Sequence, residues 1–124
     1  SLSGAFQVER QVFLKRDLGQ FQGRRKPIRI YLDSGVVDYS GDDDGARNTR
    51  AVADALRRIG WRDGVNLLHH VDEKPLEATA LAQAGLRRDK WDEAKRSQHN
   101  EFYWRLRAWR ALTFLFPPRK SEVK

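Results

Sequence analysis

The feature that most constrains the fold is a helical repeat between two short strand-like segments. Apolar residues recur at the spacing of one helix face across 48–59, and Gly60 ends the pattern. The flanking segments 27–33 and 65–71 have the composition of strands. Because the connections between them are short, the three segments predict a parallel βαβ unit. The apolar positions of the expected helix are Val52, Ala55, Leu56 and Ile59.

The first expected strand alternates apolar and polar residues. Ile28, Ile30 and Leu32 fall on one face and Tyr31 on the other. The stretch 38–45 that follows is rich in turn-forming residues. We therefore expect a strand, a polar loop and then the helix, with the loop at the carboxyl end of the strand.

The rest of the chain is expected to be mainly helical. A short helix should end near Gly19, residues 73–98 should form two helical pieces with Trp91 as their apolar anchor, and 101–116 should form one long helix. In that long helix Arg107 and Arg110 are predicted to face solvent. Its predicted buried face is made of Trp104, Ala108, Ala111, Leu112 and Leu115.

Composition limits the class of protein. A chain of 124 residues has room for one domain, which we place at 1–118 with a flexible tail at 119–124. The absence of cysteine excludes a disulfide framework. No run of eighteen apolar residues is present, so we expect no membrane-spanning helix.

The net charge of +7 could attract nucleic acid or another acidic partner. However, apart from Arg24-Arg25-Lys26, the basic residues are interspersed with acidic ones. We interpret the charge as a solvated surface and do not expect nucleic acid as a partner. A small basic module that binds nucleic acid or protein without catalysis remains the alternative.

Two residues stand where an enzyme could use them. Asp38 follows the first strand, at the edge where parallel sheets carry functional groups, although its position alone favours a turn aspartate that caps the loop. His99 precedes the long helix and has the side chain most often used as a general base. A loop histidine, or a cap of that helix, is the alternative for His99.

Other polar clusters are weaker candidates. His69 and His70 are adjacent on a strand and point to opposite faces, so with Asp72 they make a poor metal site. The acidic run 42–44 lacks the alternating pattern of a calcium loop and is expected to be a solvated turn. We predict neither a metal nor a cofactor.

The ordered set of segments resembles the end of the esterase D-like family of α/β hydrolases, which includes feruloyl and siderophore esterases. The similar segments are Ile30–Asp38, Ala51–Ile59, His99–Leu106 and Ala111–Phe116, and the opening Leu2–Phe6 also resembles part of the family. The resemblance implies the carboxyl-terminal portion of an α/β-hydrolase sheet, with two parallel strands and flanking helices. It implies a serine esterase acting on a small-molecule ester.

The resemblance also implies roles for particular residues. Asp38 would be the acid and His99 the base of a Ser-Asp-His triad, and Trp91 a wall of the substrate pocket. The sequence contains no Gly-x-Ser-x-Gly motif, so the nucleophile is not recognisable in it. We therefore expect this chain alone to be inactive, and to associate either with a missing amino-terminal part or with a second copy.

Overall fold

The computed structural model describes residues 12–23 and 27–118. The opening segment, the basic run Arg24-Arg25-Lys26 and the expected tail 119–124 lie outside the described residues, so the predictions made for them are not tested.

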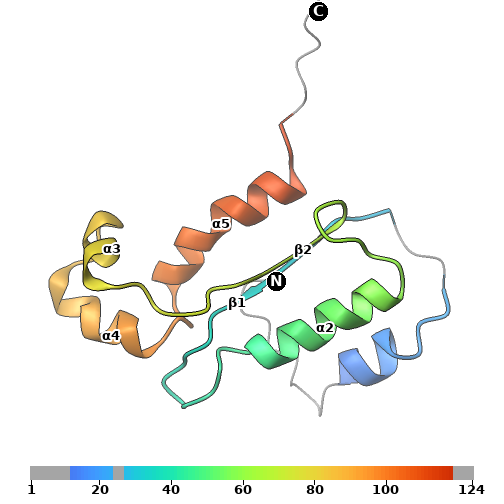
Figure 1. Ribbon diagram of the computed structural model, residues 1–124, viewed down its shortest axis with the longest axis horizontal. Coiled ribbons are helices and arrows are strands. Elements are labelled where there is room, and N and C mark those ends of the chain that lie inside the picture. Colours follow the sequence, from blue (N-terminus) through green and yellow to red (C-terminus); the bar gives the residue numbers. More distant parts are fainter. Residues whose placement is uncertain (1–11, 24–26, 119–124) are drawn as a thin grey trace, which may run out of the picture.

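A two-stranded parallel sheet lies between two long helices (Figure 1). The strands β1 (Ile30–Ser34) and β2 (Leu67–Val71) pair residue by residue, with Ile30 opposite Leu67. The connecting helix α2 (Ala46–Arg58) covers one face of the sheet and α5 (Glu101–Leu115) the other. The predicted parallel βαβ unit is confirmed.

The main core fills the layer between the sheet and α2. Leu32 and Ile30 face this layer as predicted, but Ile28 precedes β1 and is 53% exposed. The helix begins two residues before its predicted start because the Asp43 carboxylate accepts a hydrogen bond from the Arg47 N–H in its first turn. The buried members of this core are Leu32, Val52, Ala53, Leu56, Trp61 and Leu67.

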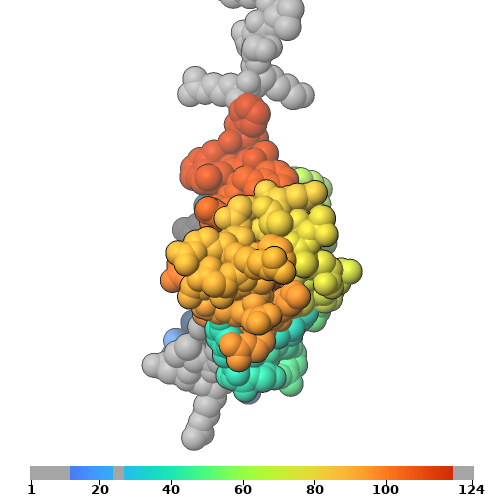
Figure 2. Space-filling model, turned by 90° about the vertical axis from the view of Figure 1, so that its left-hand side faces the viewer, coloured from blue at the N-terminus to red at the C-terminus, as the bar shows by residue number. Residues whose placement is uncertain are grey.

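The connection between β2 and α5 forms a second, smaller packing unit. Its α-helices are α3 (Ala78–Gln83) and α4 (Trp91–Arg96), and the 3₁₀ turn η2 (Arg88–Lys90) leads directly into α4, so the predicted two helical pieces are present. They cover the end of the molecule where the strands finish, with α5 above them and the loop after β1 below (Figure 2). Leu81, Ala94 and Tyr103 form the buried centre of this unit. The short helix near the start is a π-helical segment, Phe13–Leu18, followed by Gly19.

The predicted orientation of α5 is wrong. Arg107 was expected to face solvent, yet it is only 2% exposed, whereas Leu112 is 59% exposed. The positions of the apolar residues alone therefore do not determine which face of this helix is buried. The physical reason is that carboxylates gather at the ends of the strands, and a guanidinium group must meet them there.

Gln98 ties together the three loops at this end of the sheet. Its side-chain oxygen accepts a hydrogen bond from Val36 N–H, and its amide group donates to the Asp72 and Lys74 carbonyls. The backbone N–H of Gln98 donates a hydrogen bond to the Val37 carbonyl at 2.9 Å. Gln98 is fully buried, so these bonds fix the loops relative to one another.

The close approach of Gln98 requires a glycine at position 35. A Cβ atom there would lie 2.4 Å from the Gln98 Cβ, far inside contact distance. We predict that Gly35→Ala lowers the free energy of unfolding by about 1–3 kcal/mol because of this overpacking. Urea denaturation measures the change. Gly23→Ala is the control, since the nearest described atoms to its added methyl belong to the exposed Phe21 ring, which can move aside, and equal losses in both variants would contradict the prediction.

His69 predicts a dependence of stability on pH. Burial lowers its pKa from 6.5, and the positive charges of Arg57 and Arg50 act in the same direction. The unfolded chain therefore binds more protons at this position, so stability should fall as the pH drops below the unfolded value. His69→Gln should weaken that acid sensitivity in urea denaturation at mildly acidic and neutral pH. An unchanged pH dependence in the variant would contradict the assignment.

Candidate functional site

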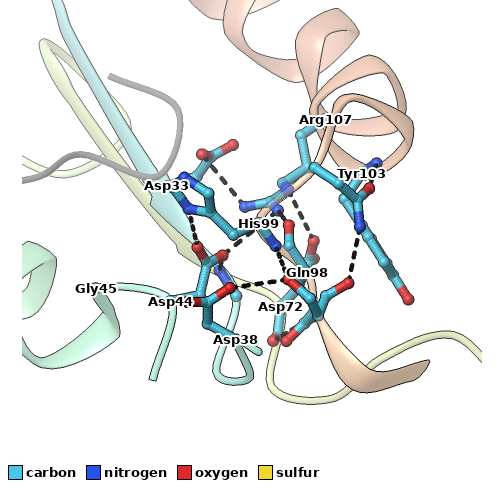
Figure 3. Close-up of polar contacts among 12 residues, drawn as sticks. Asp33, Asp38, Asp44, Gly45, Asp72, Gln98, His99, Tyr103 and Arg107 are labelled. Atoms are coloured by element: carbon cyan, nitrogen blue, oxygen red, sulfur yellow. Dashed lines mark hydrogen bonds and ion pairs between the residues drawn. The ribbon is translucent and has the colours of Figure 1, made fainter. Parts of the chain in front are cut away.

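A polar cluster occupies the end of the sheet where both strands finish and α5 begins. It is built from the loop after β1, the loop before α5 and the first two turns of α5 (Figure 3). This is the edge at which parallel sheets usually carry their functional groups. It contains both residues that the sequence analysis selected for chemistry.

His99 and Asp44 form the closest acid–base pair of the cluster. The Nδ1 atom of His99 lies 2.6 Å from Oδ1 of Asp44. The Asp44 side chain is fully buried, while the imidazole is 46% exposed. The other carboxylate oxygen accepts a hydrogen bond from Gly35 N–H at 2.6 Å. A fixed, buried carboxylate therefore orients an imidazole that solvent can reach.

The local backbone explains why Asp44 points inward. Asp44 has a φ of 48° and Gly45 a φ of 76°, so two consecutive residues adopt the left-handed conformation before α2. Aspartate tolerates this conformation better than most residues, and glycine adopts it freely. This left-handed turn directs the side chain of Asp44, the third acid of the run 42–44, into the protein. The prediction that the whole run is a solvated turn is therefore wrong for Asp44.

Asp38 does not contact the imidazole of His99. Its two oxygens accept hydrogen bonds from Ser97 Oγ at 3.0 Å and from Ser40 Oγ at 2.7 Å. Ser97 Oγ in turn accepts the His99 backbone N–H at 3.1 Å. The hydrogen bond from Ser40, followed by that from Ser97, lowers the pKa of Asp38 despite partial burial. The carboxylate partner of the ring is therefore Asp44 and not the predicted Asp38, which instead supports the backbone at His99.

One buried cation holds the acidic groups together. The guanidinium of Arg107 lies 3.5 Å from Asp33, 3.7 Å from Asp44 and 3.3 Å from Asp72 (Figure 3). It also donates a hydrogen bond to the Gln98 carbonyl at 2.7 Å. Three carboxylates from three different segments thus meet one side chain of α5, which offsets part of the cost of burying them.

Asp33 anchors this arrangement from within β1. It is fully buried and accepts a hydrogen bond from the Tyr31 hydroxyl at 2.8 Å. Burial and this neighbouring carboxylate raise the pKa of the Tyr31 phenol, so the hydroxyl remains a hydrogen-bond donor across the physiological range.

His99 has one further ring contact and does not cap α5. Its imidazole meets the Trp104 ring edge to face, with ring centres 5.2 Å apart. The cap is Asn100, whose side chain accepts the Tyr103 N–H. The capping alternative for His99 is therefore wrong. The imidazole instead contacts Asp44 and Trp104.

The two histidines of β2 lie on opposite faces of the strand. His70 Nε2 lies 2.8 Å from Asp72 Oδ1, while His69 lies on the opposite face of β2, as predicted. Within residues 12–23 and 27–118, no group of three acidic or histidine side chains could hold a metal ion.

Trp91 belongs to the packing of the smaller unit. Its indole N–H donates to the Leu86 carbonyl at 2.9 Å, and its ring packs on the second core. A cavity of about 260 Å³ lies between α4 and the start of α5, where Glu93, Asn100 and Phe102 are among its walls. Trp91 does not line it. A role of Trp91 in substrate binding stays a prediction.

Comparisons of this chain with known protein families, with curated proteins and with solved structures found no match. In the described part of the chain, no helix is both long and apolar enough to cross a membrane.

We predict that Arg107→Met lowers the free energy of unfolding by about 3–5 kcal/mol, because it leaves buried carboxylates without their cation. Urea denaturation measures the loss. Arg105→Met is the matched control on the same helix, since the Arg105 side chain is exposed and should contribute less than about 1 kcal/mol. Equal effects of the two substitutions would contradict the central role of Arg107.

Proposed function

We propose that this chain supplies the base and the acid of a serine carboxylic-ester hydrolase. The observation that carries the proposal is the pairing of a half-exposed His99 imidazole with the fully buried Asp44 carboxylate at the carboxyl edge of a parallel sheet. The resemblance to esterase D-like hydrolases points to the same chemistry, with the acid moved from Asp38 to Asp44.

The geometry supports different roles for His99 and Asp44. With Nδ1–H donating to Asp44, the lone pair of the ring lies on Nε2, the atom that would accept a proton from a nucleophilic hydroxyl. The protonated ring would then return that proton to the departing alcohol. Asp44 stabilises the imidazolium that forms between these steps.

Among the residues that the structure describes, no serine is both exposed and free to act as the attacking hydroxyl. Ser34 ends β1 but is fully buried, and the hydroxyls of Ser40 and Ser97 both donate to Asp38. Together with the absence of Gly-x-Ser-x-Gly, this supports a nucleophile outside the 124 residues. The oxyanion-binding groups would come with it, because the turn that carries the nucleophile usually provides one of them.

The alternative of a basic binding module gains little support from the arrangement of charge. Several exposed cations pair with acids near them: Arg47 with Asp43, Arg50 with Glu73, Arg57 with Asp54 and Asp63, Arg87 with Asp89, and Lys90 with Glu93. Such pairing reduces the field available to attract a polyanion.

A paired assay tests the proposed function. The 124-residue chain should not turn over a nitrophenyl ester or react with a serine-directed fluorophosphonate. A longer polypeptide from the same reading frame, extended before Ser1, should do both. Turnover by the 124-residue chain would contradict the proposal that the nucleophile lies outside these residues. An extended polypeptide without a reactive serine would overturn the hydrolase proposal.

In the active polypeptide, the identity of the acid can be tested directly. Asp44→Asn should lower kcat by about 10⁴-fold, because an amide at this position no longer selects the reactive tautomer of His99. Asp38→Asn should leave kcat within the same order of magnitude, since Asp38 reaches His99 only through the Ser97 hydroxyl, which accepts the His99 backbone N–H. The reverse pattern would assign the acid to Asp38, as the sequence alone suggested.

A further inference from the structure

A second cavity lies between α5 and the segment that follows β2. Its volume is about 460 Å³, within the range of small-molecule sites, and neither His99 nor Asp44 lines it. One wall is formed by 70–74 and Leu76, and the other by one face of α5. The residues of that face are Tyr103, Leu106, Arg107 and Arg110.

The acidic residues of this cavity already have partners. Glu73 pairs with Arg50 at 3.0 Å. Asp72 bonds the His70 ring at 2.8 Å and lies 3.3 Å from Arg107. Each acid thus has a basic side chain or a histidine ring beside it, although Asp72 shares Arg107 with Asp33 and Asp44, and these contacts reduce the repulsion that an incoming anion meets.

Two basic side chains of the cavity have no carboxylate beside them in the described part of the chain. Neither Arg110 nor Lys74 forms an ion pair with a carboxylate of the described residues. Nη1 of Arg110 is buried and has no hydrogen-bond acceptor. The rest of its guanidinium has partners: it hydrogen-bonds the Tyr31 phenol, which opposes the rise in the pKa of that group, and it lies 5.5 Å from the centre of the Trp109 ring. A buried donor of this kind is costly unless an acceptor reaches it.

The rest of the lining is apolar. Val71, Leu76 and Leu106 contribute aliphatic surface. Tyr103 contributes its ring, because its hydroxyl already donates to the Ala94 carbonyl and accepts the Leu76 N–H. A ligand that fits this lining has one anionic end and a hydrocarbon body.

We propose that this cavity binds a small organic monocarboxylate. Its carboxylate would meet Arg110 and Lys74, and its hydrocarbon part would lie against Leu76, Leu106 and the ring of Tyr103. This site is independent of the hydrolase proposal, since it uses neither member of the His99–Asp44 pair.

Titration of the 124-residue chain with benzoate and with hexanoate, followed by backbone NMR, tests the site. Amide resonances of residues 70–76 and 103–110 should shift in a saturable manner. Benzamide, which has the shape of benzoate without its charge, should bind at least about tenfold more weakly because it loses the charged hydrogen bonds. No shift with either carboxylate, or equal affinity for benzamide, would overturn the proposal.

Substitutions assign the recognition to particular residues. Arg110→Met and Lys74→Met should each weaken benzoate binding, with the larger loss, about tenfold, at Arg110. Arg58→Met removes the same charge from the exposed side of α2 and should leave the affinity unchanged. Lys74 is exposed, so its variant should fold normally even if Arg110→Met does not. Equal weakening by Arg58→Met would show general charge attraction and overturn the proposal.

Discussion

The buried guanidinium of Arg107 is the interaction on which the rest of the structure depends. It lies within 3.7 Å of three carboxylates that come from β1, from the loop before α2 and from the segment after β2. Without a cation in this position, those acids could not remain together and charged away from water. This contact explains the orientation of α5 and helps to hold the buried Asp44 beside His99.

The site is also held by neutral groups. Gln98 joins the loops after both strands through hydrogen bonds to backbone groups, and Gly35 leaves the space that this side chain needs. Because His99 follows Gln98 directly in the chain, the same bonds that close the loops also place the imidazole. The fold and the proposed catalytic pair therefore share one buried polar network, so substitutions in that network should rarely affect stability alone or the pair alone.

The sequence predicted the parts of this fold that rest on local patterns. The parallel βαβ unit, both strands, the two-piece connection and the end of α5 near Pro117 follow from periodicity and turn residues. The buried face of α5 could not be found in this way, because burial of Arg107 depends on acids 35 to 74 positions away from it in the chain. Long-range charge pairing has no periodic signature.

The carboxylate that meets His99 could not be identified from local sequence patterns either. Asp38 stands nearer the end of β1 and matches the expected position, whereas Asp44 looks like one of three solvated turn residues. An Asp-Gly pair directly before a helix was the available signal, since both residues tolerate the left-handed turn that points the carboxylate inward. Even so, sequence alone could not show which of the neighbouring acids His99 would meet.

Proton NMR of the His99 ring tests the pairing most directly. In the folded chain, Nδ1–H should give a strongly downfield resonance, because it donates to the buried Asp44 carboxylate at 2.6 Å. That resonance should disappear in Asp44→Asn and persist in Asp38→Asn. Persistence in Asp44→Asn together with loss in Asp38→Asn would show that the imidazole is oriented by the other carboxylate, and would contradict the site described above.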